Sequence, residues 1–324
     1  MKLFAALLMT GMFASLSAPI LAQEPPWPVK PIQLIVTGGA GGVVDIRGRW
    51  LAERLAPALG QPVIVENKLG AGGNIGMGMA ARSKPDGYTL VIIHQGTMTI
   101  NPHLYSRLGY DPLTDFIPIT RVGLGSLLLA VNPKVPATTV GELVQLAKAN
   151  PGKLTFSSPG VGTPPHLAGE LFKRVTAIDV AHVAYKGGGQ AVADLIGGHI
   201  TFTIEGLTVL LPQVKAGKLR ALGVTGPRRV ASLPEIPTIA EAGIAGYEFQ
   251  GWVGVAAPAG TPKPIIARLY REMSTVLGTQ EARDYFGEFG AVPGADPPDV
   301  FAAAIRAEHA QWGTVIREAG IKAE

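Results

Sequence analysis

The sequence predicts an α/β protein of two lobes, in which each lobe is a mostly parallel sheet flanked by helices. Residues 32–59 and 154–175 share one pattern, a β-branched apolar run followed by a glycine-rich turn and an amphipathic helix. Strand-like runs alternate with helical patterns for most of the chain, which is typical of parallel α/β sheets. At 324 residues, the chain is also long enough for two domains that each bury a core.

The expected strands follow one another at intervals that leave room for helices between them. They are residues 32–36, 63–66, 89–93, 127–131, 154–156, 199–204 and 219–224. Apolar residues recur at helical spacing after the first and the fifth of these strands, and we expect them to face the core. These residues are Ile46, Trp50, Leu51, Leu55 and Leu59 in one helix, and Leu167, Leu171, Phe172 and Val175 in the other.

Two extended segments predict the connections between the lobes. Residues 116–122 form one, and residues 250–257, which end at Pro258, form the other. Two such crossings make a hinge. In this arrangement lobe 1 is 23–123 plus 251–324, with its last helices at 264–277, 281–289 and 298–319, and lobe 2 is 124–250.

An export signal is expected at the N-terminus. Residues 1–22 place Lys2 ahead of an apolar stretch and end on Ala22, the pattern of a cleaved secretory signal. A membrane anchor is the alternative, but polar and helix-breaking residues interrupt the run, and a spanning helix needs about 20 predominantly apolar residues. We therefore expect an exported mature chain that begins near Gln23 and lies outside the cytoplasm.

Composition and motifs argue against several other classes of function. The 28 Lys+Arg against 24 Asp+Glu leave a mild positive charge, and the basic residues are scattered, so nucleic-acid binding is not expected. The sequence has no Walker A lysine, GxSxG elbow, HExxH pair or cysteine, and its GxGxxG-like turn ends in Val44. The six histidines lack metal-ligand spacing. We expect no catalytic residues, no metal and no cofactor.

Glycine-rich turns ahead of helices are the candidate binding elements. The first-turn N–H groups of a helix lack partners and its dipole attracts negative charge, so each such turn is a potential half-site for an anion. Small residues in the first turn also let the backbone approach a ligand closely. Asp45 is well placed as helix N-cap, and ligand contact is its alternative role. The candidates here are Gly38, Gly39, Ala40, Gly41, Gly42 and Asp45.

Three further loops could complete the site. The first offers an amide and a hydroxyl after a strand, although a simple turn fits equally well. In the second, Thr163 is the preferred donor or helix cap, and His166 is expected to make structural hydrogen bonds. The third could form a concavity of N–H groups, where Lys186 either pairs with a carboxylate or faces solvent. The candidates, loop by loop, are Gln95, Gly96 and Thr97; Ser158, Gly162, Thr163 and His166; and Tyr185, Lys186 and Gly187.

Several longer runs match a known family. They include PVKPIQLIV, GQPVIVENKLGAGGNIG, PGKLTFSSPGVGT, AYKGGGQAVADLIGGHI and AGKLRALGVT. The mature chain resembles the Bug family, the periplasmic solute receptors of tripartite tricarboxylate transporters. The resemblance implies a two-lobed periplasmic-binding-protein (flytrap) fold that binds small organic acids between its lobes. It also implies a membrane permease of a large and a small subunit as partner, while some members instead act as ligand sensors for signalling proteins.

Departures from the usual family residues bear on the ligand. Gly38 stands where members commonly have an aromatic ring, and Glu205-Gly206 replaces the usual Asp-Asn, so Glu205 joins the candidate site. Residues that are usually small or polar are replaced by Val43, Val44, Val161 and Pro164. We therefore expect the ligand to be an acid that is larger or more apolar than aspartate or glutamate, with aromatic acids among the candidates. We also expect the receptor to be a monomer.

Overall fold

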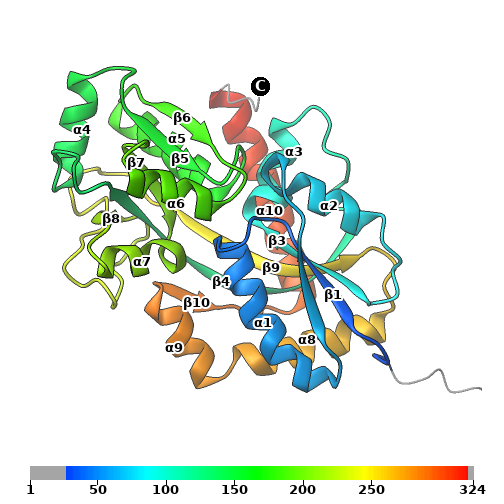
Figure 1. Ribbon diagram of the computed structural model, residues 1–324. Coiled ribbons are helices and arrows are strands. Elements are labelled where there is room, and N and C mark those ends of the chain that lie inside the picture. The colour runs from blue at the N-terminus through cyan, green and yellow to red at the C-terminus, as the bar shows by residue number, and fades with distance from the viewer. Residues whose placement is uncertain (1–26, 320–324) are drawn as a thin grey trace, which may run out of the picture.

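The computed structural model describes residues 27–319, which form two lobes joined by a shared run of strands (Figure 1). The strand order is β2-β1-β3-β9-β4-β7-β5-β6, with β8 and β10 also paired to β4. The expected signal segment, residues 1–22, lies outside the described residues. Within residues 27–319, no helix combines the length and the apolar character that crossing a membrane requires.

Lobe 1 is built around three parallel strands. β1 (Ile32–Val36) lies between β2 (Val63–Asn67) and β3 (Thr89–His94) and is parallel to both. The helices α1 (Val43–Leu59) and α2 (Asn74–Ala81) follow β1 and β2 through glycine-rich turns. The apolar stripe of α1 packs against the strands and α8 (Lys263–Leu277) in one buried cluster, which includes Trp50, Leu51, Leu55, Leu59, Ile92 and Leu269.

Lobe 2 repeats this construction. β5 (Thr155–Ser158) lies between β6 (Ala181–Ala184) and β7 (Phe202–Gly206) and is parallel to both. The flanking helices are α4 (Val140–Ala149), α5 (Pro164–Thr176), α6 (Gly188–Gly197) and α7 (Leu207–Lys215). Beneath α4 and α5 lies a second cluster, which includes Leu143, Phe156, Phe172, Phe202 and Tyr247.

β4 (Phe116–Val131) runs from one lobe into the other. Up to Ser126 it pairs antiparallel with β9 (Gln250–Pro258), and from Leu127 it pairs with β7 and β8 (Arg220–Val224). The chain returns just before β9, where the N–H of Phe249 donates to the carbonyl of Thr225 at 2.8 Å. Every antiparallel pair in the described sheet involves β4 or β9, so the parallel order of each lobe is broken only where the chain crosses.

α10 (Pro298–Ala319) contacts both lobes. It follows α8 (Lys263–Leu277), α9 (Gln280–Glu288) and the short strand β10 (Ala291–Pro293). Near its start, Phe301 and Ile305 pack in a lobe 1 cluster, whereas Ile316 near its end packs in the cluster that joins Ile100 and Leu104 of lobe 1 to the lobe 2 core. In Figure 1 this red end lies between α5 of lobe 2 and α3 (Asn101–Leu104) of lobe 1. The helix that the sequence assigned to lobe 1 therefore ends beside the junction of the two lobes.

The predicted fold class is confirmed, and the differences lie in short elements. β6 was not anticipated because it has only four residues and is partly exposed along its length. The strand expected at 199–204 begins at Phe202, since Gly198 ends α6 with φ 82° and the chain turns before the strand starts. Two short helical turns, η1 (Ala71–Gly73) and η2 (Gly96–Ile100), follow β2 and β3.

Candidate functional site

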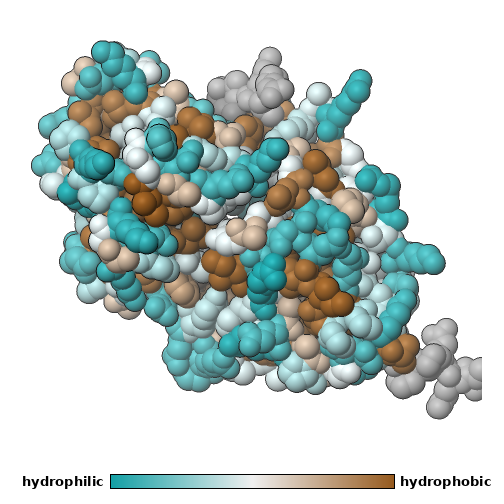
Figure 2. All heavy atoms as spheres, in the orientation of Figure 1, coloured by the Kyte–Doolittle hydropathy of each residue, from teal (hydrophilic) through white to brown (hydrophobic). Residues whose placement is uncertain are grey.

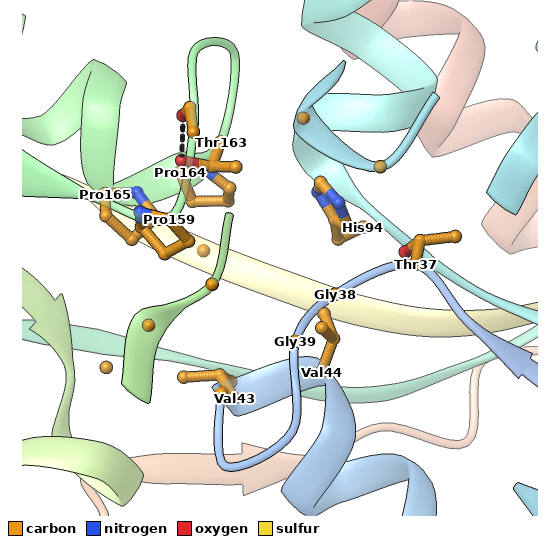
Figure 3. A pocket seen from close by; sticks show the side chains of 18 of the residues that line it. Thr37, Gly38, Gly39, Val43, Val44, His94, Pro159, Thr163, Pro164 and Pro165 are labelled. Atoms are coloured by element: carbon orange, nitrogen blue, oxygen red, sulfur yellow. Dashed lines mark hydrogen bonds between the residues drawn. The ribbon is translucent and has the colours of Figure 1, made fainter. Parts of the chain in front are cut away.

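A cavity of about 270 Å³ lies between the lobes and is lined from both sides. Lobe 1 contributes the loop after β1, the turn before α2 and the end of β3, and lobe 2 contributes the loops before α5 and α6 and the end of β7. β4 and β9 line the cavity through residues 125–127 and 251–253. Figure 3 shows Pro164 of lobe 2 facing His94 and Val44 of lobe 1 across the open space.

The loop after β1 presents mainly backbone to the cavity. Ala40 and Gly41 are exposed and do not line it. Gly42 is the N-cap of α1, so the first-turn N–H groups and the positive end of the helix dipole lie at the cavity wall. The lining residues from this loop are Thr37, Gly38, Gly39, Gly42, Val43 and Val44.

Asp45 is not the N-cap of α1, so this prediction is wrong. It lies in the first turn, three residues beyond Gly42, and is buried outside the cavity. Its Oδ2 accepts from the N–H of Gly41 at 2.9 Å, and its Oδ1 accepts from Arg49 Nε and Asn67 Nδ2, both at 2.9 Å. Burial acts to raise the pKa of Asp45, but these hydrogen bonds hold it below its ordinary value. Asp45 therefore fixes the shape of the loop.

Arg47 of α1 brings a buried positive charge to the cavity. It is 6% exposed, its Nη1 donates to the carbonyl of Gly123 at 3.4 Å, and its guanidinium lies 5.5 Å from the ring centroid of Phe286. Among the residues that the structure describes, it forms no ion pair with a carboxylate. Burial lowers the pKa of Arg47 to about 10, so it remains charged at neutral pH. A buried charge without a partner is costly, and an anion in the cavity would offset that cost.

Glu205, at the end of β7, brings a buried carboxyl group to the same cavity. It is 2% exposed, and its Oε1 accepts from the N–H of Gly206 at 2.7 Å. Its Oε2 has no hydrogen-bond partner within residues 27–319. Burial raises the pKa of Glu205 to about 7, against the smaller opposing effect of the Gly206 N–H. The cavity wall therefore holds one unused acceptor as well as one unpaired cation.

Three helix amino ends meet around the Glu205 carboxyl group. Gly206 is the N-cap of α7, and Gly187 is the N-cap of α6. A Cβ atom on Gly188 would lie 3.2 Å from Glu205 Oε2, and a Cβ atom on Gly206 would lie 2.2 Å from Cγ2 of Val43 in the first turn of α1. The dipoles of these helices attract negative charge to a place that the protein's own carboxyl group occupies.

Ser158, Gly162 and His166 shape the loop before α5 and do not line the cavity. The Ser158 hydroxyl donates to the carbonyl of Gly160 at 3.1 Å and lies 2.7 Å from His182 Nε2. The Gly162 N–H donates to His166 Nδ1 at 3.2 Å. Burial, and then the neighbouring positive groups, lower the pKa of His166 to about 3, so it stays neutral. This structural role for His166 agrees with the expectation.

Thr163 lines the cavity at the start of α5, but its hydroxyl does not cap the helix. The hydroxyl donates to the carbonyl of Gly160 at 2.6 Å, as the dashed line in Figure 3 marks. Pro164 and Pro165 occupy the first turn and also line the cavity. Because proline has no N–H, the amino end of α5 offers the cavity fewer donors than those of α1 and α6.

Gln95, Gly96 and Thr97 lie beside the cavity without lining it. Gln95 Nε2 donates to Glu308 of α10, and the Thr97 hydroxyl donates to the carbonyl of His94 at 3.0 Å. His94 lines the cavity in their place, and its Nδ1 has no partner in the described part of the chain. Burial lowers the pKa of His94 to about 4, so the ring is neutral near pH 7.

Tyr185, Lys186 and Gly187, ahead of α6, all line the cavity as expected from the sequence. The Tyr185 hydroxyl donates to Asp194 Oδ2 of α6 at 2.6 Å, so this hydroxyl already has a hydrogen-bond acceptor within lobe 2. Burial and the Asp194 hydrogen bond raise the pKa of Tyr185 to about 12. Lys186 is exposed at the rim.

The loops of the two lobes touch beside the cavity. The Tyr105 hydroxyl of lobe 1 donates to the carbonyl of Val161 in lobe 2 at 3.2 Å. A Cβ atom on Gly162 would lie only 1.8 Å from Asn101 Oδ1, on the other lobe. Figure 2 shows atoms of both lobes in contact across the middle of the molecule. Such an approach requires glycine, since any side chain would overlap the opposite lobe.

Several lining residues were not nominated from the sequence, although signals for them were present. Arg47 lies three and four residues before Trp50 and Leu51, so helical periodicity puts its charge on the buried face of α1. Residues 70–73 repeat the strand, glycine turn and helix pattern between β2 and α2. His94 ends a parallel strand, where ligands of open α/β sheets bind.

Two α/β lobes that share crossing strands and enclose a cavity define a periplasmic solute-binding protein. A structure from R. palustris solved with adipate has a TM-score of 0.89 and 36% identity, covering 91% of this chain and 99% of that chain. MatC from Rhodopseudomonas palustris, solved with bound malate, has a TM-score of 0.84 and 29% identity, covering 90% and 100%. Among the described residues, no group of three or more metal-ligating side chains could hold a metal ion.

This chain belongs to the TctC family, the receptors of tripartite tricarboxylate transporters. The family model, described as the tripartite tricarboxylate transporter family receptor, matches residues 48–321. Protein BugT of Bordetella pertussis is 36% identical over 310 residues, which cover 95% of this chain and 94% of BugT. The resemblance to the Bug family is therefore confirmed, and the family is one of solute receptors rather than enzymes.

Proposed function

We propose that this receptor binds a small organic carboxylate in the cavity between its lobes. Arg47 carries the proposal, because it is a buried cation that lines the cavity and has no carboxylate of the described chain beside it. A ligand carboxylate would supply the missing charge and accept several guanidinium N–H bonds. The amino end of α1 adds backbone N–H groups on the same wall. The relatives solved with adipate and with malate support the same ligand class.

The ligand is proposed to be larger or more apolar than aspartate or glutamate, and aromatic acids fit this description. The apolar lining includes Val43, Val44, Val161, Pro164 and Trp252. A cavity of about 150 Å³ can hold benzene, and this cavity has a volume of about 270 Å³. One ring with two substituents, or a chain of comparable volume, would therefore fit.

Ligand contact is proposed for the nominated residues that line the cavity, with Arg47 and His94 added. The proposed mechanism is closure of lobe 1 (23–123 plus 251–324) on lobe 2 (124–250) about β4 and the start of β9. Each lobe holds part of the lining, so a ligand that touches both stabilises the closed form. The contact residues are Gly38, Gly39, Gly42, Arg47, His94, Thr163, Tyr185, Lys186, Gly187 and Glu205.

The proposed setting is the periplasm, and the proposed partners are the two permease subunits of a tripartite tricarboxylate transporter. The family to which the chain belongs, and the signal-like residues 1–22, support this assignment. The closed receptor would carry its ligand to the permease as a monomer. Nothing in this role needs a cofactor.

A thermal-shift screen of the mature chain tests the carboxylate proposal. The panel is aliphatic and aromatic carboxylates, matched neutral amides, amino acids and sugars. We expect the midpoint to rise with one class of carboxylates, since a ligand at 100 times its dissociation constant adds about 2.7 kcal/mol of stability. The matched amides should give no rise. A response to sugars alone, or equal responses to acids and amides, would refute the proposal.

Arg47→Met should weaken binding of every carboxylate hit from about tenfold to a hundredfold. The reason is the loss of a charge-assisted hydrogen bond worth about 1.5–3 kcal/mol. Isothermal titration calorimetry measures the dissociation constants. Arg54→Met is the matched control, because Arg54 lies on the same helix but pairs with Glu281 and does not line the cavity. Equal affinities for the two variants would exclude Arg47 as the carboxylate partner.

A further inference from the structure

Arg47 and Glu205 place a cation and a carboxyl group in one cavity without pairing with each other. Both are buried, at 6% and 2% exposed, and both line the cavity. Within residues 27–319 neither forms an ion pair with any side chain, and so they do not pair with one another. Buried charged groups in folded proteins are normally paired. Both of these groups are therefore available to contact a ligand in the cavity.

Strand β4 gives the spacing of the two groups. Arg47 donates to the carbonyl of Gly123, and Glu205 pairs in register with Leu128. These two β4 residues are five positions apart, or about 16 Å of extended strand, and the lining residues Gly125, Ser126 and Leu127 lie between them. The cavity therefore has a cationic part and an acceptor part at different places along β4, and an elongated ligand would contact both.

The acceptor part is the unusual one for a carboxylate receptor. Three helix amino ends converge there, yet the anion they attract is the carboxyl group of Glu205 itself. Its Oε1 is satisfied by Gly206, and its Oε2 has no partner. A second ligand carboxylate at this position would meet a carboxyl oxygen, whereas a ligand hydroxyl or ammonium would satisfy Oε2.

We propose that the ligand is a monocarboxylate with a hydrogen-bond donor at its far end, its carboxylate on Arg47 and its donor on Glu205 Oε2. This inference rests on the carboxylate-binding function proposed above. It makes Glu205 the residue that selects against dicarboxylates of the same length. The donor is a hydroxyl or an ammonium group, and the probes of the experiment distinguish between these two.

The test is a calorimetric titration of the wild-type protein at pH 8 with length-matched acids. The aliphatic probes are hexanoate, 6-hydroxyhexanoate, 6-aminohexanoate and adipate, and the aromatic probes are benzoate, 4-hydroxybenzoate, 4-(aminomethyl)benzoate and terephthalate. We expect a donor-bearing acid to bind at least about tenfold more tightly than both the unsubstituted acid and the diacid of its series. Tightest binding by the hydroxy acid identifies a neutral donor, and by the amino acid a cationic one.

Glu205→Gln provides the matched change, because its amide has the same shape and can donate to a second carboxylate. We expect it to shift the ratio of diacid to donor-bearing acid by at least about tenfold in favour of the diacid. Glu235→Gln, an exposed change in lobe 2 outside the cavity, should leave that ratio unchanged.

The outcomes separate the two proposals. Adipate or terephthalate binding to the wild-type protein as tightly as the donor-bearing acid of its series would overturn the role of Glu205 and leave the carboxylate receptor intact. Absence of binding by all eight acids, together with a thermal-shift screen silent to carboxylates, would overturn both proposals. The wild-type series decides the inference even if a variant fails to fold.

Discussion

Gly162→Ala is expected to weaken ligand binding by about a hundredfold or more, or about 3 kcal/mol. The new Cβ atom would lie 1.8 Å from Asn101 Oδ1 across the lobe junction, far inside van der Waals contact. Asn101 cannot move aside easily, because it is fully buried and donates to Asn74 Oδ1 at 2.6 Å. The alanine therefore opposes closure while leaving each lobe intact. Calorimetry with the tightest carboxylate gives the affinity, and small-angle scattering shows whether that ligand still contracts the molecule.

Gly217→Ala is the matched control for this prediction. Gly217 has φ +68°, against +79° for Gly162, so alanine is strained at both positions. A Cβ atom on Gly217 would meet nothing within 4 Å. The control should therefore lose about 1–2 kcal/mol of stability from backbone strain but keep its affinity. Equal affinities for Gly162→Ala and Gly217→Ala would show that contact between these loops is not needed for binding.

Acid should destabilise the ligand-free protein by roughly 3 kcal/mol between pH 6.5 and pH 4. Burial lowers the pKa of His94 to about 4 and that of His166 to about 3, from an ordinary value of 6.5. Below pH 6.5 the unfolded chain therefore binds protons that the folded chain does not, and stability falls as the pH falls. His182, whose pKa is lowered to about 4 by burial and by Lys173, acts in the same direction but is less buried.

Glu205 opposes this trend. Its pKa is raised to about 7, so its contribution to stability is present at low pH and is lost as the pH rises through 7. The stability that Glu205 gains on acidification offsets about what one histidine loses, so a net loss of stability at low pH remains. Urea unfolding at several pH values measures the slope, which His94→Gln should reduce and Glu205→Gln should steepen. The exposed His199→Gln is the control. A stability that stays constant from pH 6.5 to pH 4 would contradict the prediction.

The fold was predictable because local and long-range signals agree along most of the chain. β1 has the predicted bounds, and α1 presents the predicted Trp50, Leu51, Leu55 and Leu59 to the core. The sequence could not show that β4 would join both sheets, since residues 116–131 read as two separate strands. Asp45 was predicted as the N-cap because its side chain suits that position. The helix instead begins directly after Gly42, three residues before Asp45.

The site was predictable where it is built of backbone, as in the glycine-rich loops around Gly39 and Gly187, both of which line the cavity. It was less predictable where a residue lines the cavity only if its side chain points toward it. Gln95 turns away to Glu308, a partner 213 residues distant in the chain, and only the packing of α10 reveals this. Arg47 faces the cavity because α1 places it on the buried side, a position that simple exposure rules for arginine would reject.

Helix α10 adds a noncovalent link between lobes that already share two chain crossings. The cluster around Ile316 joins residues of both lobes, so opening the cavity would separate its members while Phe301 stays anchored in lobe 1. Exposing one isoleucine side chain costs about 1.5–3 kcal/mol, which is comparable with the effect of a bound ligand. α10 would thus stabilise the closed form of the empty receptor. The residence time of a captured acid would then depend on a helix that does not line the cavity.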